Sequence, residues 1–134
     1  MHKRDFVVDT GRRQTVDITR EVGAILDDLD GDGLLNVFVP HATAGVAIFE
    51  TGAGSEEDLG EALARLFPRD DRYVHAHGSK GHGADHVIPA FVGSSITIPV
   101  ASGRMELGTW QRIVLVDPNL DNPTRQVLVR FIEG

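Results

Sequence analysis

Histidine is concentrated in one short part of this chain. Four of the six histidines lie within twelve positions, from His75 to His86, among glycines, and a fifth, His41, opens a separate segment. Neutral imidazole is the commonest metal ligand in proteins and the usual proton carrier near neutral pH. This density predicts a metal site or an acid–base site. A solvated histidine-rich and glycine-rich loop without chemistry is the alternative interpretation.

Composition narrows the chemistry that these histidines can do. The chain has 134 residues, which predicts a single domain over residues 1–134. It has no cysteine, which confines a bound metal to histidine and carboxylate ligands. The net charge is -7, from 20 acidic and 13 basic residues, which argues against a nucleic-acid partner. No apolar run has the length of a signal peptide or of a membrane helix, so we expect a cytoplasmic protein without a membrane partner.

Short β-prone runs make up most of the remaining sequence. The first two surround Gly11-Arg12-Arg13, which predicts an opening β-hairpin. The expected strands are residues 6–8, 15–18, 34–39, 44–49, 95–100, 104–107, 112–117 and 127–132.

Two amphipathic helices are predicted between these strands. Apolar residues recur at helical spacing over residues 19–29, with Thr19 as the N-cap, and again over residues 55–66, where Ser55 and Asp58 resemble a capping box. A shorter helix is expected over residues 84–92, limited by Pro89. The order of elements predicts an α+β fold, a mainly antiparallel sheet or β-sandwich with the two main helices packed outside.

Five collinear motifs give the chain a resemblance to a known family. They are His41-Ala42-Thr43-Ala44-Gly45-Val46 with Glu50 at its end, Tyr73-Val74-His75, Ala84-Asp85-His86-Val87, Gly93-Ser94-Ser95-Ile96-Thr97-Ile98-Pro99 and Leu107-Gly108-Thr109-Trp110-Gln111. Together they cover nearly the whole chain, which resembles the YjbQ family, also called UPF0047 or the secondary thiamine-phosphate synthase family. The resemblance implies a YjbQ-like α+β sandwich, a homotrimer with sites near subunit interfaces, and a cleft built from the three motif histidines.

The resemblance also implies an activity, which joins a pyrimidine diphosphate to a thiazole phosphate and could be a secondary reaction. Three positions depart from the family pattern. Phe49 and His82 stand where relatives have asparagine, and Ile88 stands where relatives often have a basic residue. The missing base weakens the expectation of a bound phosphate, although Lys80 could reach the cleft from the loop.

The leading hypothesis is an enzyme that acts on a small phosphorylated metabolite. In it, His41, His75 and His86 hold a divalent ion, zinc or magnesium, or act as acid–base groups, and Glu50 is a base or an orienting group. The residues expected to line the substrate site are Thr43, Lys80, His82, Trp110 and Gln111.

Several alternatives stay open. The site could bind an anion without a metal, and the protein could be a non-catalytic module that binds a small anion or a metal. His77 and His82 could be rim residues of the longer loop, and Trp110 could be a core anchor.

Overall fold

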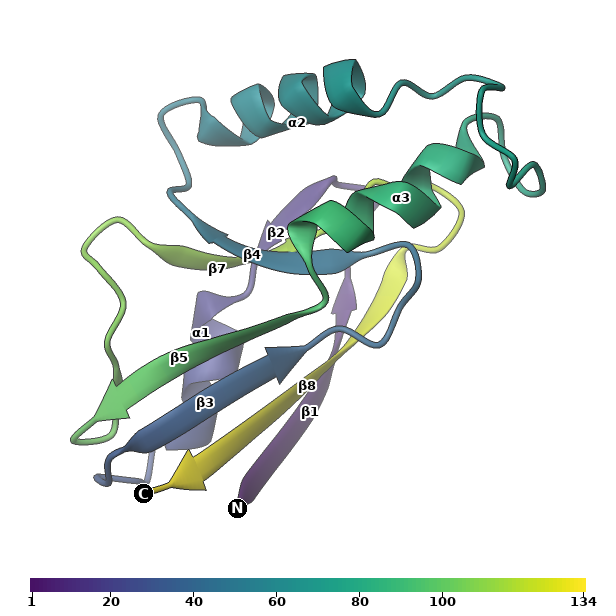
Figure 1. Ribbon diagram of the computed structural model, residues 1–134. Helices are drawn as coiled ribbons and strands as arrows, with labels where there is room; N and C mark the ends of the chain where they lie inside the picture. The colour runs from purple at the N-terminus through teal and green to yellow at the C-terminus, as the bar shows by residue number, and fades with distance from the viewer.

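Two antiparallel sheets form the centre of the computed structural model, which describes residues 1–134 (Figure 1). The first sheet has the order β1 (His2–Asp9), β8 (Thr124–Glu133), β3 (Gly33–Phe38), β5 (Ser95–Ala101) and β6 (Arg104–Met105). The second has the order β2 (Thr15–Asp17), β7 (Arg112–Val116) and β4 (Gly45–Phe49). The helices are α1 (Thr19–Gly23), α2 (Ser55–Leu66) and α3 (His82–Val92). The predicted α+β class and antiparallel sandwich are confirmed.

Strand β7 shows why the second sheet carries helices on its outer face. Ile113 and Leu115 point into the main core between the sheets, whereas the alternate residues Val114 and Val116 pack against α2 and α3. Both sets are buried because successive side chains of a strand point to opposite faces. The helices α2 and α3 therefore lie outside the sandwich on this sheet, which agrees with the prediction for the helix over residues 55–66 (Figure 1).

Helix α1 is shorter than the sequence predicted. Its α-helical part ends at Gly23, and a 3-10 turn, Ala24–Leu26, follows. The expected N-cap at Thr19 is wrong, because Ile18 occupies that position. The Thr19 hydroxyl instead donates to Asp17 Oδ1 at 2.7 Å and accepts from the Ile113 N–H at 2.8 Å, which ties the helix to β7.

The expected opening hairpin is wrong. Strand β1 pairs with β8 and β2 pairs with β7, so the two strands belong to different sheets. The chain crosses between the sheets at Thr10, whose N–H donates to the Pro123 carbonyl at 2.7 Å, and then turns through Gly11 and Arg12, both with positive φ. Strand pairing here is decided by distant partners, and a local turn signal cannot report it.

The two outer helices begin differently from the sequence expectation. The N-cap of α2 is Gly54, with φ 91°, and no side chain caps the helix, so the predicted capping box is wrong. Helix α3 begins at His82, two residues before the expected start, and Pro89 is accommodated near its C-terminal end. None of the helices has the length and apolar character needed to cross a membrane.

Candidate metal centre

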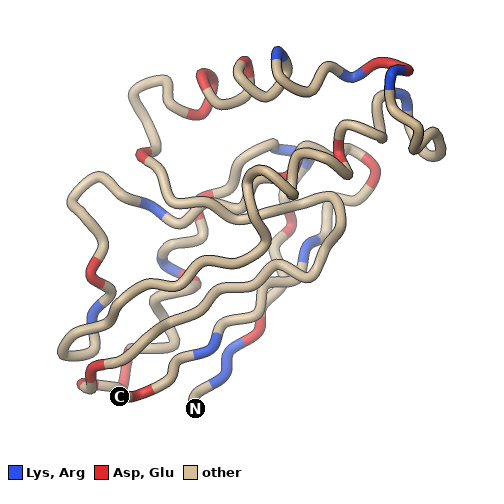
Figure 2. The backbone as a smooth tube through the Cα atoms, viewed as in Figure 1, with Lys and Arg blue, Asp and Glu red and all other residues tan.

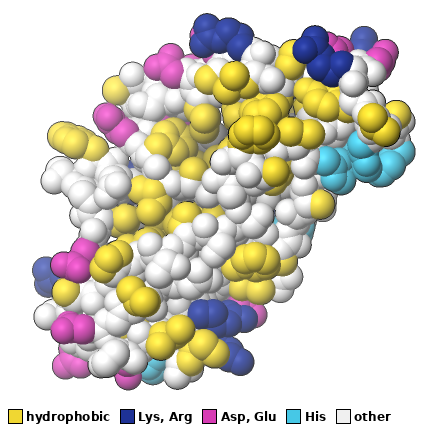
Figure 3. Space-filling model, in the orientation of Figure 1, with side chains coloured by type: hydrophobic (Ala, Val, Ile, Leu, Met, Phe, Trp, Pro, Cys, Tyr) yellow, Lys and Arg dark blue, Asp and Glu magenta, His cyan; other side chains and the backbone are white.

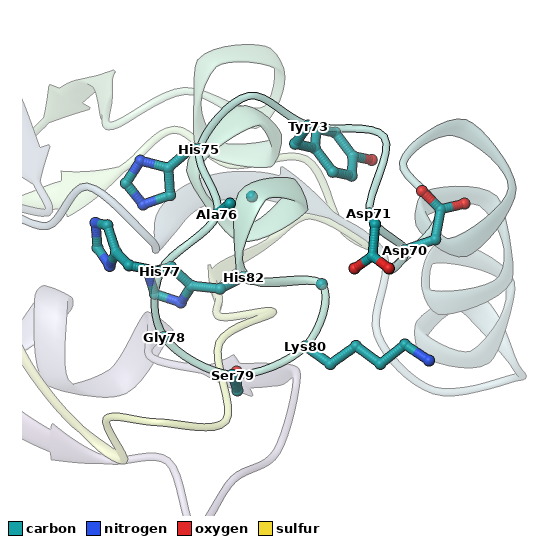
Figure 4. Close-up of a pocket in the computed structure, with 12 residues that line it drawn as sticks. Asp70, Asp71, Tyr73, His75, Ala76, His77, Gly78, Ser79, Lys80 and His82 are labelled. Carbon is teal, nitrogen blue, oxygen red and sulfur yellow. The ribbon is translucent and has the colours of Figure 1, made fainter.

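Three histidines meet at the N-terminal end of α3 and the loop before it. His75, His82 and His86 each offer one imidazole nitrogen, and these three nitrogens lie within 4.8 Å of one another. Histidine side chains form one patch at this edge of the molecule, and the close-up shows His75, His77 and His82 on the same side of the loop (Figures 3 and 4). The geometry is that of a group able to hold one ion.

The early start of α3 places two of the three rings. His82 and His86 are four residues apart, so they lie on the same helix face, and their Nε2 atoms are 2.8 Å apart. Gly81 is the N-cap, with φ 79°, a backbone conformation that glycine adopts without the steric penalty of a Cβ atom. Gly81 therefore lets the helix begin at His82, and this start places His82 and His86 on one helix face.

A second glycine brings His75 to the helix. A Cβ atom on the buried Gly83 would lie 2.4 Å from Tyr73 Cβ and 2.7 Å from the His75 carbonyl oxygen. Only a residue without a side chain allows this approach. The Tyr73 hydroxyl donates to the Pro68 carbonyl at 2.9 Å and holds the approaching segment in place. The ring centroids of His75 and His86 are 4.0 Å apart.

One atom of this group has no partner. His75 Nε2 is buried and makes no hydrogen bond, the only buried side-chain nitrogen or oxygen in the protein without one. Leaving such an atom unsatisfied costs about 1–3 kcal/mol. Since buried polar atoms are almost always paired, the orphaned nitrogen fits a ligand that lies between the three rings.

The surroundings of His75 and His86 favour the neutral form of both imidazole rings. Burial lowers the pKa of His75 and of His86 below the usual value for histidine, and the neighbouring imidazoles lower both further. A neutral imidazole keeps a lone pair on one nitrogen, and this lone pair is what a metal ion binds. The electrostatics and the geometry therefore favour the same ligand.

A buried polar network supports the base of α3. Asp85 is fully buried and accepts hydrogen bonds from Arg69 and, at 3.1 Å, from Asn119 Nδ2. Burial raises the pKa of the Asp85 carboxyl, and the Arg69 guanidinium opposes this effect. Asn119 Nδ2 also lies 3.1 Å from His82 Nδ1, and Asp121 Oδ2 lies 3.3 Å from the same nitrogen. The loop between β7 and β8 thus reaches the histidines.

A cavity of about 280 Å³ lies along the loop that carries His75 and His82, and its lining includes His77, Ser79 and Lys80. The His77 ring centroid is 3.9 Å from that of His75, so His77 stands beside the group of three. The Lys80 side chain extends from the loop away from the imidazole rings (Figure 4). Charges of both signs lie on the turn at residues 69–72 next to this loop (Figure 2).

The predicted ligand His41 lies outside this group. Its Nε2 accepts a hydrogen bond from the Gln126 N–H at 2.8 Å. Burial lowers the pKa of His41, as does the nearby Arg125 guanidinium. Thr43 from the same segment accepts from Arg125 Nη2 at 2.9 Å, so its hydroxyl helps to fix this segment against β8. The structure brings His75 and His86 together, adds His82 and leaves His41 apart.

The remaining predicted site residues lie at the other end of the molecule. Glu50 follows the end of β4, and Trp110 and Gln111 precede β7, whose Arg112 pairs with Phe49. In Figure 1 this end of β4 and β7 is opposite the N-terminal end of α3. Trp110 is 72% exposed, so the alternative of a core anchor is wrong, and Gln111 Oε1 accepts from the Gly108 N–H. The fold of the chain does not bring these residues to the three histidines.

Comparison with known proteins agrees with this fold. The family model described as UPF0047 protein YjbQ-like matches residues 4–134. The chain belongs to this YjbQ-like family. A UPF0047 protein from Mycobacterium tuberculosis is 66% identical over 127 residues, covering 95% of each chain, and one from Archaeoglobus fulgidus is 34% identical over 96% of this chain and 99% of its own length.

Solved structures of YjbQ-like proteins have the same fold. A hypothetical protein from Aeropyrum pernix superposes with a TM-score of 0.89 at 36% identity and full coverage of both chains. A YbjQ-like protein of unknown function from Sulfolobus solfataricus superposes with a TM-score of 0.90 at 27% identity, covering 99% of this chain and 97% of its own. Both superpositions cover nearly the whole chain, so the fold is shared over its full length.

Proposed function

We propose that this protein is a metal-dependent enzyme that acts on a small phosphorylated metabolite at the group formed by His75, His82 and His86. The observation that carries the proposal is the convergence of three imidazole nitrogens within 4.8 Å, in a group where His75 Nε2 is buried without a hydrogen-bond partner. Three protein ligands leave one position of a tetrahedral ion open, which is the arrangement of catalytic rather than structural zinc sites.

The donor set favours zinc over magnesium. All three candidate ligands are nitrogens, and magnesium prefers oxygen ligands in octahedral geometry, whereas zinc binds imidazole readily in tetrahedral sites. A bound zinc ion supplies a Lewis acid that polarises a phosphoryl oxygen or lowers the pKa of a water molecule. The surrounding residues orient the rings, and burial of the rings excludes bulk water from one side of the site.

The substrate class rests on the local chemistry. The positive end of the helix dipole of α3 points toward the loop cavity. Lys80 lines that cavity together with Asp70 and Asp71, so an anionic group would be stabilised at the helix end and not beside the two carboxylates. Thiamine-phosphate synthesis is the narrower form of the proposal. In it the thiazole nitrogen forms a bond to the methylene carbon of the pyrimidine, and the bond from that carbon to the diphosphate oxygen breaks, releasing pyrophosphate.

The decisive experiment compares His86→Ala with His2→Ala. Both remove one imidazole, but His2 lies on β1 beside Glu133, away from the group of three. We expect protein purified without a histidine tag to contain one zinc per chain by elemental analysis. Zinc at 100 times its Kd should stabilise wild type and His2→Ala by about 2.7 kcal/mol and should not stabilise His86→Ala. Zinc binding by His86→Ala equal to that of wild type would refute the site.

Turnover distinguishes an enzyme from a binding module. Wild-type protein should release pyrophosphate from the pyrimidine diphosphate and thiazole phosphate pair, or phosphate from one of a panel of phosphorylated metabolites, and His86→Ala should not. Zinc binding with a ligand-dependent rise in melting temperature, but without turnover of any member of the panel, would support the non-catalytic module instead.

We further propose that the protein works as a homotrimer in the cytoplasm. The outer face of the first sheet carries no helix and exposes apolar side chains among polar ones (Figure 1): Leu34 stands opposite Ile132 and both are about half exposed, Phe38 stands opposite Leu128, and Asn36 between them stands opposite Arg130. Exposed apolar side chains rimmed by polar ones mark subunit contacts. A homotrimer has three times the chain mass of 14.5 kDa, which sedimentation measures directly.

A charge on this face should dissociate the trimer. Phe38→Glu is expected to give monomers, whereas Leu66→Glu, on the exposed side of α2, should leave the mass unchanged. A monomeric wild type would contradict the assembly. Cell fractionation tests the location, and recovery of the protein with the membrane fraction would contradict that part of the proposal.

A further inference from the structure

The nitrogen of His82 that faces away from the group of three has two competing neighbours. Asn119 Nδ2, a donor, lies 3.1 Å from His82 Nδ1, and Asp121 Oδ2, an acceptor, lies 3.3 Å from it. The donor identity of Asn119 is fixed by its other contacts. Its Nδ2 donates to Asp85, and its Oδ1 accepts from the backbone N–H groups of Asp121 and Asn122.

These two neighbours favour different tautomers of the imidazole. Asn119 can donate only to an unprotonated Nδ1, which places the ring proton on Nε2. Asp121 can accept only from a protonated Nδ1, which leaves the Nε2 lone pair free. His82 Nε2 is the atom that faces His86 Nε2 at 2.8 Å, so a metal ion between the rings requires the second tautomer.

We propose that Asp121 is a positioning residue that holds His82 in the tautomer with the proton on Nδ1 and so presents Nε2 to the metal ion. The inference rests on the proposed metal centre and adds a residue to it that no sequence motif indicates. Carboxylates that accept the second N–H of a ligating histidine fix both its tautomer and its ring orientation.

The placement of Asp121 supports this role. Its Oδ2 accepts from the Ser79 hydroxyl at 2.9 Å, which joins the loop between β7 and β8 to the histidine-carrying loop. The Asp121 backbone N–H donates to Asn119 Oδ1 at 2.8 Å. Ser79 thus holds the carboxylate beside the ring and Asn119 holds the backbone of Asp121, although the Asp121 side chain is 43% exposed. An unconstrained surface aspartate would have no such fixed position.

Zinc affinity of matched aspartate variants tests the proposal. Asp121→Ala removes the acceptor, and Asp71→Ala removes an equal charge from a residue that lines the cavity beside His82 and has no hydrogen bond to an imidazole. Dissociation constants come from competition with a chromophoric chelator, and thermal unfolding of the ion-free proteins checks that each variant folds. We expect Asp121→Ala to bind zinc about 10–100 times more weakly than wild type and Asp71→Ala to bind within about threefold of it.

Two further readouts separate positioning from charge. Asp121→Asn keeps an acceptor oxygen without the charge, so it should regain affinity over Asp121→Ala. Nitrogen-15 spectra of the ion-free proteins should show the His82 proton on Nδ1 in wild type and on Nε2 in Asp121→Ala. Equal affinities of Asp121→Ala and Asp71→Ala, with zinc bound by wild type, would overturn this role and leave the metal centre standing. Failure of wild type to bind zinc would overturn the centre itself.

Discussion

The buried ion pair between Asp117 and Arg125 offers the sharpest test of how the fold supports the site. Both side chains are almost fully buried, and Asp117 accepts from Arg125 Nε at 2.7 Å and from Arg125 Nη2 at 2.8 Å. Asp117 Oδ1 also accepts from the Asn119 N–H at 3.0 Å. Asp117→Ala therefore removes the acceptor of three hydrogen bonds and leaves a guanidinium in the core with Thr43 as its remaining side-chain partner.

Removing one partner of a buried ion pair costs about 3–5 kcal/mol, because the other charge stays buried without compensation. For a domain of this length, a loss of that size lowers the melting temperature by roughly 10–20 °C. Urea unfolding of the ion-free protein gives the free energy directly, with an unchanged m-value if both variants unfold in the same way.

Two variants control this measurement. Asp70→Ala breaks the exposed pair with Arg72 and should leave the melting temperature within about 2 °C of wild type, because exposed ion pairs contribute little. The double variant Asp117→Ala with Arg125→Met removes both charges and should recover part of the loss. A loss of less than about 1 kcal/mol in Asp117→Ala, or no recovery in the double variant, would refute the reasoning.

Two other predictions concern the histidines and the glycine beside them. The pKa values of His75 and His86 are lowered in the folded protein, so as pH falls below about 6.5 the unfolded chain takes up protons first. Ion-free wild type should therefore lose stability between pH 7 and pH 5, and His86→Asn should lose less in the same urea titrations; equal losses would contradict the shift. Gly83→Ala should destabilise by about 2 kcal/mol or more and weaken zinc binding, because its Cβ meets backbone atoms and Tyr73. Gly60→Ala, inside α2 and facing only the flexible Gln14 amide, should be neutral or stabilising by up to about 1 kcal/mol, and an equal loss in both variants would contradict the packing argument.

The strands of this protein were predictable because their signal is local. Apolar β-branched runs such as residues 112–117 are visible in the sequence, and the structure places β7 there. The pairing of strands β1 and β2 depends on residues far away in the sequence, so it was not predictable in the same way. The turn at Gly11 and Arg12 resembles a hairpin turn, but β1 and β2 find partners more than 90 residues away, and no spacing within the first 20 residues can report that.

The difference between local and distant signals also explains which of the clustered histidines could be predicted from the sequence. His75 and His86 were expected to meet, whereas His82 was interpreted as a rim residue because the helix was expected to begin at residue 84. The signal for His82 was present in its spacing of four from His86, which is one helical turn. Gly81 and Gly83 masked that signal. Glycines on both sides of a histidine indicate a loop, and here they form the helix start and the close contact with Tyr73.

The loop between β7 and β8 connects the core to the histidines by a continuous set of hydrogen bonds. Arg125 holds Asp117, Asp117 accepts from the Asn119 N–H, and the Asn119 side chain contacts both Asp85 and His82. One of the three candidate ligands, His82, thus depends on an ion pair that it does not touch. It follows that Asp117→Ala should weaken zinc binding as well as stability, because Asn119 and Asp121 lose the anchor that places them beside His82.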